Sequence, residues 1–319
     1  MPTACVPVVR LSDYTEGDAA ARASFVRAYG EGLESFGFVT VTGHGVDTEA
    51  IRRVYADVAA VFALPRAEKD ACAVPASCGN RGYVAFGQEH AKNRAVGDLK
   101  EFWHVGRETE SLGARGRNAF PPGVPTFEPN TKALFGALEQ AAFAMLEALA
   151  DYLGEPSDTF SSMARDGNSI LRLIHYPPLG YDVAAASAGG VRAAEHEDIN
   201  LITLLCESTG AGLEILKKDG SWLALDAPPG HLVVDTGDMM QRLTNGRIPS
   251  VTHRVVNPPD ERHDVPRYSL PFFVHPRPEV SLRVVPTCRR EGEPELPPVT
   301  ADTFLQERLA AIGLAKATK

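Results

Sequence analysis

A series of short apolar runs, each closed by turn residues, occupies the chain from about residue 169 to residue 274. The turn signals include Asp219-Gly220 and Asn245-Gly246, dipeptides that tolerate positive φ angles. Runs this short and this closely spaced predict a sandwich or jelly roll rather than a parallel sheet with crossover helices. Strands are expected at residues 170–176, 201–205, 213–216, 222–225, 231–235, 251–256 and 268–274.

Helical periodicity flanks this β-rich region on both sides. Apolar residues recur at helical spacing from Phe25 to Phe36, and Gly37 follows as a stop signal. The spacing predicts further helices at about residues 51–62, at residues 131–153 and from residue 300 onward, with a short strand at residues 38–41. The chain is therefore expected to be mainly β with flanking helices.

Residues 71–129 are irregular and rich in Gly, Pro and polar residues. Long irregular stretches inside a compact protein often form lids or pocket walls. We predict a helical N-terminal region with lid-like loops at residues 1–115. The long helix, the β-rich core and the final helix would then fill residues 116–319, and the two regions would form one compact unit.

Composition narrows the class of protein. The chain has 319 residues, of which 44% are hydrophobic and 23% are charged, as in ordinary soluble globular proteins. A net charge of −9 argues against a nucleic-acid or anionic-membrane partner, and no apolar run approaches the roughly 20 residues of a membrane helix. The first residues lack the pattern of a secretion signal. Five scattered cysteines without a CxxC pair favour free thiols in a reducing cytoplasm.

The stretch EHEDINLITLL, residues 195–205, reads as a buried strand with a charged start. In an extended chain the side chains of His196 and Asp198 point to one face, whereas Glu195 and Glu197 point to the other. Imidazole plus carboxylate is two-thirds of the facial triad of non-haem Fe(II) oxygenases. The third ligand should be a His on another strand: His253 qualifies, with His231 and His275 as rivals. The alternative is that these histidines are ordinary core or edge residues.

A second group of polar residues stands at strand ends. Arg267 and Ser269 share a face by the period of two in an otherwise apolar run. Such an Arg can bind a carboxylate bidentately, with the Ser hydroxyl as a second contact. Tyr176, at the end of an earlier strand, could donate a hydrogen bond to the same ligand. The alternatives are an Arg paired with a protein carboxylate and a Tyr packed on Pro177.

The ordered set of motifs resembles the isopenicillin N synthase-like Fe(II)/2-oxoglutarate-dependent oxygenases. The likeness covers nearly the whole chain, and its segments are VPVVRLSDY, ESFGFVTVTGHGV, VFALPRAEK, LRLIHYPP, HED, DGSWLALDAPPGHLVVDTGDMMQRLTNG, HRVV and RYS. This resemblance implies a double-stranded β-helix, or jelly roll, as the catalytic core. It also implies an enzyme that uses Fe(II), 2-oxoglutarate and O₂ to oxidise a C–H bond of a small organic molecule, with release of succinate and CO₂.

The resemblance also implies roles for individual residues. His196, Asp198 and His253 would bind Fe(II). Arg267 and Ser269 would bind the distal carboxylate of 2-oxoglutarate, with a hydrogen bond from Tyr176. The family pattern also makes His231 and His275 structural, and His44 and His263, which fall in loop contexts, receive the same interpretation.

One position departs from the family pattern. Many relatives carry Asn two residues before the Tyr of the Tyr-Pro motif, where this chain has Ile174. Arg172 or His175 could supply the missing polar contact, and both are candidates for the substrate pocket. Four further residues are candidates for lining the substrate pocket. Tyr83, Phe102 and His104 stand among polar residues in the irregular region, and Phe272 lies in the last predicted strand. Simple packing on the core is the alternative for each.

Two rival functions are compatible with these motifs. One is a ferrous oxidase on the same fold that uses O₂ without 2-oxoglutarate. The other is a non-catalytic relative that keeps the pocket to bind a metal or ligand.

Overall fold

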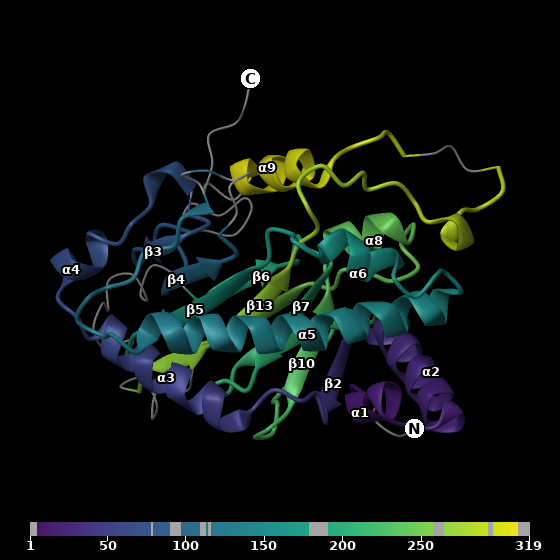
Figure 1. The fold of residues 1–319 in the computed structure, drawn as a ribbon, viewed down its shortest axis with the longest axis horizontal. Helices are drawn as coiled ribbons and strands as arrows, with labels where there is room; N and C mark the ends of the chain where they lie inside the picture. Colours follow the sequence, from purple (N-terminus) through teal and green to yellow (C-terminus); the bar gives the residue numbers. More distant parts are fainter. Residues whose placement is uncertain are drawn as a thin grey trace.

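Two β-sheets that face each other form the centre of the molecule, and helices cover the larger sheet (Figure 1). The computed structural model describes residues 5–77, 79–89, 97–108, 113, 116–178, 191–257, 265–292 and 296–311. Apolar side chains from both sheets pack together, including Phe38 and Val233 from the larger sheet and Leu213 and Ile215 from the smaller one. This architecture agrees with the predicted jelly roll.

The larger sheet is mixed and contains nine of the described strands. Its hydrogen-bonded strands follow the order β1, β2, β10, β7, β13, β5, β4, β3. The ninth strand, β12, lies outside this order and pairs with β5. The strand bounds, in that order, are Val8–Arg10, Phe38–Thr42, Leu232–Thr236, Ile202–Cys206, Pro271–Val274, Ile170–Tyr176, Glu101–Gly106 and Gly82–Val84, with β12 at Arg267–Ser269.

The smaller sheet has four described strands in the order β6, β11, β8, β9. They span Ala193–His196, His253–Val255, Leu213–Leu216 and Trp222–Ala224. Strands β8 and β9 form the hairpin expected around Asp219-Gly220, and Gly220 has the positive φ of 82° that this turn requires.

Helices α2 (Ala19–Phe36), α3 (Thr48–Phe62) and α5 (Phe127–Leu153) are the longest in the described chain, and α2 and α3 both contact α5. In Figure 1, α5 crosses one face of the larger sheet. Helix α9 (Ala301–Ala311) lies near the top of the view, whereas α2 and α3 lie near the bottom. The shorter helices are α1 (Leu11–Thr15), α4 (Arg66–Asp70), α6 (Thr159–Ala164) and α8 (Asp238–Leu243), with 3-10 turns at Pro75–Ser77 and Pro286–Cys288.

Among the described helices, α5 is long and apolar enough to cross a membrane by length and composition alone. However, 67% of its most apolar window is buried inside the fold. Leu134, Leu138, Leu146 and Leu149 are fully buried, and the helix packs against α2, α3, α6 and the larger sheet. We therefore assign α5 as a core helix.

Several sequence predictions need correction at the level of strands. The stretch 195–205 is not one strand: β6 ends at His196 in the smaller sheet, and β7 begins at Ile202 in the larger sheet. The predicted strand 268–274 is divided into β12 and β13 at Leu270, directly before Pro271, which has no backbone N–H to donate.

The region 71–129, expected to be irregular, contributes two strands to the larger sheet. Strand β4 is buried along its whole length although it contains Glu101 and His104. Lys69 neutralises the first of these, with 2.9 Å between Nζ and Oε2, and Arg172 donates a hydrogen bond to the second. Because Lys69 and Arg172 are distant from β4 in the sequence, the sequence alone did not show that Glu101 and His104 would be paired. The segment was therefore not predicted as a buried strand. Strand β4 also pairs with β5, so both predicted regions share one sheet.

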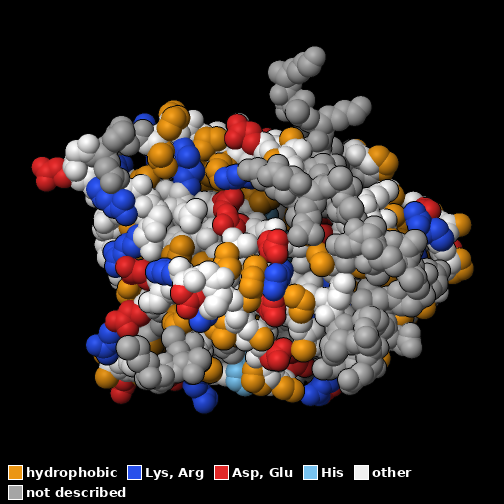
Figure 2. Space-filling model, turned by 180° about the vertical axis from the view of Figure 1, so that it is seen from behind, with side chains coloured by type: hydrophobic (Ala, Val, Ile, Leu, Met, Phe, Trp, Pro, Cys, Tyr) orange, Lys and Arg blue, Asp and Glu red, His pale blue; other side chains and the backbone are white. Residues whose placement is uncertain are grey.

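The surface seen from behind has acidic and basic side chains interspersed with apolar ones (Figure 2). Elsewhere in the described chain, exposed ion pairs such as Arg66–Asp70 and Lys132–Glu128 show the same mixing of charges. Pairs of this kind contribute little to stability, so the buried core carries most of it.

Two glycines inside helices allow a matched test of this packing. Gly136 in α5 has open space where a Cβ would stand, so Gly136→Ala should stabilise the protein by about 0.5–1 kcal/mol. A Cβ on Gly30 in α2 would lie 2.0 Å from Cγ of Tyr152, so Gly30→Ala should cost about 1–3 kcal/mol. Urea unfolding of the two variants measures both effects, and equal free energies of unfolding would contradict the described packing of α2 on α5.

Candidate active site

Three side chains that can bind a metal meet where the two sheets face each other. Strands β6 and β11 are antiparallel, and their register places His253 directly opposite His196. The two imidazole centroids are 4.3 Å apart. One oxygen of Asp198, Oδ1, lies 3.9 Å from Nε2 of His196 and 3.8 Å from Nε2 of His253. The potential ligand atoms all lie within 4.8 Å of one another.

Backbone contacts orient both imidazoles. Nδ1 of His196 donates to the carbonyl of Ala194 at 2.7 Å, and Nδ1 of His253 donates to the carbonyl of Val251 at 3.2 Å. Since a carbonyl can only accept, each ring carries its proton on Nδ1 and leaves the Nε2 lone pair directed at the cluster. Burial and the adjacent His253 lower the pKa of His196 to about 4, so this imidazole is neutral, as a metal ligand must be.

The carboxylate of the cluster is held from the larger sheet. Thr203 of β7 donates a hydrogen bond to Oδ2 of Asp198, which leaves Oδ1 facing the two imidazoles. Burial and the nearby Asp198 raise the pKa of Asp235 on β10 well above its ordinary value. Two imidazoles and one carboxylate around a single point match the chemistry of a divalent iron site with open positions.

A cavity of about 70 Å³ extends from this cluster between the two sheets to Arg267. The guanidinium of Arg267 is buried: its Nε donates to the carbonyl of Gly210 at 2.9 Å and its Nη2 donates to Ser208 Oγ at 3.1 Å. Its Nη1 has no hydrogen-bond partner in the described part of the chain. No described carboxylate forms an ion pair with Arg267, which answers the alternative raised by the sequence. A buried cation with a free donor suits a bound carboxylate.

The other two residues predicted at this cavity also line it. Ser269 and Tyr176 are both buried, and Arg267 pairs with Tyr176 across strands β12 and β5. Ile174 lines the same cavity and offers it no polar group. Of the two candidates for replacing that contact, Arg172 lines the cavity. His175 points to the opposite face of β5, where its Nδ1 donates to Glu101 at 2.8 Å.

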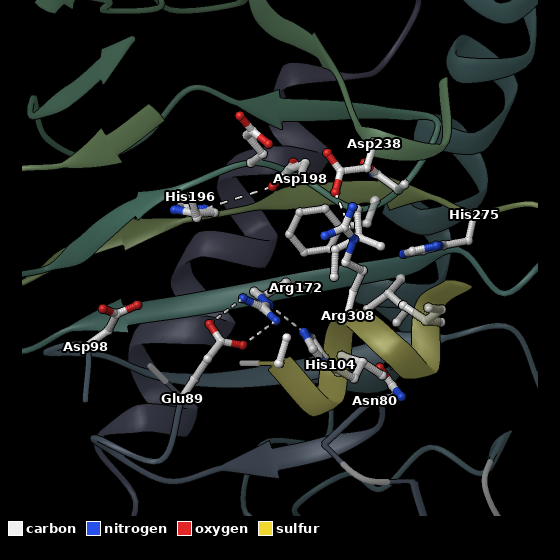
Figure 3. Close-up of a pocket in the computed structure, with 18 of the residues that line it drawn as sticks. Asn80, Glu89, Asp98, His104, Arg172, His196, Asp198, Asp238, His275 and Arg308 are labelled. Atoms are coloured by element: carbon white, nitrogen blue, oxygen red, sulfur yellow. Dashed lines mark hydrogen bonds and ion pairs between the residues drawn. The ribbon is translucent and has the colours of Figure 1, made fainter. Parts of the chain in front are cut away.

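A second cavity, of about 390 Å³, adjoins the first at this cluster, and Figure 3 shows its lining residues. It shares five lining residues with the smaller cavity: Lys100, Arg172, His196, Asp198 and Phe273. Helix α9 forms one wall through Leu305, Arg308 and Leu309, which recur at helical spacing on one face. Ligands in the two cavities would therefore be separated only by a thin layer of side chains and the cluster itself.

A buried ionic network forms the floor of the larger cavity. Arg172 donates to both oxygens of Glu89, at 3.0 Å and 2.9 Å, and through Nε to Nε2 of His104 at 2.6 Å. The guanidinium carbon lies 4.3 Å from the ring centroid of Phe102 and 5.1 Å from that of Phe273. Lys100 pairs with Glu89 at 2.7 Å. Although burial acts to raise the pKa of Glu89, the charges of Arg172 and Lys100 lower it overall, so the carboxylate is ionised.

Of the side chains predicted to bind substrate, only Arg172 and His104 line the larger cavity. Phe102 packs beneath the guanidinium of Arg172. The hydroxyl of Tyr83 donates to Glu101 at 2.5 Å, on the side where His175 also binds Glu101. Figure 3 shows Arg172 between His104 and Glu89, with dashed lines for its hydrogen bonds to both.

The expectation for Phe272 does not agree with its position. Its ring packs edge-on against Phe135 of α5, with 4.9 Å between centroids, and its neighbour Phe273 lines both cavities instead. Successive side chains of a strand point to opposite faces, so an error of one residue in assigning the face reverses the prediction.

The remaining histidines divide into two kinds. His44 bonds the backbone through both ring nitrogens, and His231 is partly exposed and bonds the carbonyl of Pro229, in agreement with structural or surface roles. His263 lies outside the described residues. His275, expected to be structural, lines the larger cavity and has a ring nitrogen without a partner among the described residues.

Other cavity residues carried no local signal in the sequence. Glu89, Asp98 and Lys100 lie in the region expected to be irregular, and Asp238 and Arg308 come from two helices far apart in the chain. Their pairing, at 3.2 Å between Arg308 Nε and Asp238 Oδ2, depends on tertiary structure. An unusual density of charged residues around Phe102-Trp103 was the one clue available to sequence reasoning.

Comparison with known proteins identifies the family. Residues 6–123 match the family described as non-haem dioxygenase in morphine synthesis N-terminal, and residues 167–276 match the 2OG-Fe(II) oxygenase superfamily. The chain is 31% identical to the 2-oxoglutarate-Fe(II) type oxidoreductase hxnY of Emericella nidulans over 318 residues, which cover 96% of this chain and 89% of that protein. It is 32% identical to gibberellin 2-beta-dioxygenase 2 of Arabidopsis thaliana, over 88% of this chain and 76% of the relative.

Solved structures agree with the sequence relatives. A 2OG-Fe(II) oxygenase family protein from Caulobacter crescentus superposes with a TM-score of 0.85 at 39% identity, over 97% of this chain and 100% of that one. A Neurospora crassa protein solved in complex with alpha-KG and thymine has a TM-score of 0.85 at 28% identity, over 96% of each chain. The chain therefore belongs to the 2-oxoglutarate–Fe(II) oxygenase family, whose enzymes use Fe(II), 2-oxoglutarate and O₂.

Proposed function

We propose that His196, Asp198 and His253 bind the Fe(II) of this oxygenase and that Arg267, Ser269 and Tyr176 bind its 2-oxoglutarate. The observation that carries this proposal is the free Nη1 of buried Arg267, which shares one cavity with all three candidate metal ligands. When bound, Fe(II) and 2-oxoglutarate supply an O₂-dependent oxidation of a C–H bond, with release of succinate and CO₂.

The protein's own contribution begins with the three ligands. Two imidazoles and one carboxylate form a set of donors that suits a divalent cation. The backbone carbonyls bonded to both Nδ1 atoms fix the rings, and Thr203 fixes Asp198, so the ligands are oriented before the metal arrives. Three ligands leave open positions for cosubstrate and O₂.

Arg267 acts by position and charge, not by proton transfer. The carbonyl of Gly210 and the hydroxyl of Ser208 hold two of its nitrogens, so the guanidinium needs no reordering to receive a carboxylate. Ser269 adds a hydroxyl on the same cavity wall, and Tyr176 adds a phenol. Arg172 and Lys100 line both cavities, and their charges are already paired with Glu89.

The organic substrate would occupy the larger cavity, beside His196 and Asp198. That cavity combines apolar side chains such as Phe273 and Leu305 with the ionic floor, which suits a small polar organic molecule. The structural neighbour from Neurospora crassa was solved with thymine, a molecule of this size class. We further infer a reducing compartment such as the cytoplasm, because the described cysteines Cys5, Cys72, Cys206 and Cys288 are all free thiols.

Removing one ligand tests the metal assignment. His196→Ala should abolish stoichiometric Fe(II) binding, because even the loss of groups that only support a ligand costs about 10–100-fold in metal affinity. Iron retained after desalting under anaerobic conditions is the measurement. His231→Ala, at a partly exposed histidine that lines neither cavity, is the matched control and should retain one iron. Full retention of iron by the His196 variant would mean that the cluster is not the iron site.

Removing the guanidinium tests the cosubstrate assignment. Hydrogen bonds to charged groups contribute about 1.5–3 kcal/mol, and each 1.4 kcal/mol is a factor of about ten, so Arg267→Leu should raise the KM for 2-oxoglutarate about 10–100-fold. Succinate formation at varied 2-oxoglutarate is the assay. Arg277→Leu, which removes a partly exposed Arg paired with Glu279, should leave this KM unchanged. An unchanged KM in the Arg267 variant would refute the role of this residue.

A further inference from the structure

His275 follows strand β13 at the larger cavity and is only 6% exposed. Its Nδ1 has no hydrogen-bond partner in the described residues, and its backbone N–H is already bonded to Ser169. In Figure 3 the ring points toward Arg308 and the interior of the cavity. Leaving a buried polar atom unpaired is costly, so a ligand that bonds this imidazole from the cavity would remove that cost.

Asn80 is a second wall residue with unused hydrogen-bonding groups. Its backbone is fixed: the carbonyl accepts from Nη1 of Arg81 at 2.7 Å, and the N–H donates to the carbonyl of Ser77. His104 donates to the carbonyl of the preceding Gly79 at 2.6 Å. No described residue bonds the side-chain amide of Asn80, which lines the cavity. The amide is therefore presented by a rigid segment and keeps a donor and an acceptor for a ligand.

Charged side chains in the cavity wall are already paired with one another. Arg172 and Lys100 face Glu89, and Arg308 faces Asp238. Glu195 at the edge pairs with Arg254 at 3.1 Å, and Glu197 is exposed at the rim. A charged substrate would have to leave water and compete with these pairs for a counter-ion. The wall therefore favours a substrate without net charge.

We propose that His275 and Asn80 determine specificity by binding an uncharged substrate that carries an amide or cyclic amide. The substrate's oxidisable carbon would lie at the opposite end of the cavity, beside His196 and Asp198. This inference rests on the proposed function, because it assigns the larger cavity to the organic substrate.

The chemistry of the two side chains selects this class of ligand. The carboxamide of Asn80 matches an adjacent C=O and N–H, as in an amide, by one donated and one accepted hydrogen bond. Burial lowers the pKa of His275 to about 4, so its imidazole is neutral and can donate through one nitrogen and accept through the other. A carboxylate has no donor, so the acceptor of each residue would stay unpaired beside it. Phe273 and Leu305 cover the apolar part of such a molecule.

The test measures binding of two matched pairs of probes: uracil with orotate, which keeps the cyclic amide and adds a charge, and benzamide with benzoate, which replaces the amide by a carboxylate. The full-length protein is loaded with Fe(II) and 2-oxoglutarate without O₂, and dissociation constants are measured by saturation-transfer NMR titration. At least one amide probe should bind at least about tenfold more tightly than its carboxylate partner, which corresponds to about 1.4 kcal/mol. Equal affinities within both pairs, or tighter binding of the carboxylates, would overturn the proposal.

Variants then assign the preference to residues. His275→Phe keeps the ring but removes its nitrogens, and Asn80→Leu keeps the shape but removes the amide, so each should weaken the amide probe about tenfold. His275→Gln restores a donor and an acceptor and should recover most of the affinity. His231→Phe, the same change at a position outside both cavities, should have no effect. Amide binding that is unchanged in both His275→Phe and Asn80→Leu would refute the assignment.

The same samples separate this inference from the proposed function. Neither His275 nor Asn80 lines the smaller cavity, so the absorption of the Fe(II)–2-oxoglutarate complex should persist in all variants. If the unmodified protein forms no such complex, the proposed function fails. If the complex forms but the amide preference is absent, only the substrate inference fails.

Discussion

The antiparallel pairing of β6 with β11 is the contact on which the rest of the site depends. Its register sets His253 opposite His196, and the carbonyls of Ala194 and Val251 turn both rings the same way. The chain then leaves the smaller sheet directly after His196, so that Asp198 can be held by Thr203 of the larger sheet. The cluster thus ties the two sheets together, and both cavities open from that junction. A shift of one residue in this register would turn a ligand away from the cluster.

Arg172 and Lys100, which line both cavities, are cations whose charges are neutralised within the protein. A carboxylate cosubstrate brings negative charge into the interior, and buried ions are tolerated only with partners. Arg267 has a free donor at the smaller cavity, whereas Arg172 and Lys100 are already paired with Glu89 and Asp98. The wall is therefore polar and rigid without carrying an uncompensated charge. Stacking of Arg172 between Phe102 and Phe273 adds to this rigidity.

Sequence reasoning succeeded where one strand or one local motif carries the information. Alternation alone brought His196 and Asp198 to one face and turned Glu195 and Glu197 outward, where the structure has them exposed. It failed where the answer depends on which strand lies opposite: the stretch 195–205 belongs to two sheets, and its apolar tail gave no sign of the break. Phe272, predicted to line the substrate pocket, lines neither cavity, whereas Phe273 lines both; the sequence does not separate them, since both faces of β13 are apolar. The pairs of Glu89 and Arg308 have no sequence signal, because their partners are distant in the chain.

Unpaired polar atoms in this fold are informative because most buried charges are satisfied. Lys69 and Glu101 are paired deep in the structure, and Glu89 is bonded on both oxygens, although neither site needs a ligand for this. Among the described residues, six buried side-chain atoms lack a partner, and two of them, on Arg267 and His275, belong to cavity-lining residues. The other four, on Tyr29, Arg81, Arg107 and Arg192, belong to residues that line neither cavity, so the two at the cavities are distinguished by their position. That position, on adjoining cavities, fits two different ligands: an anion at Arg267 and a neutral molecule at His275.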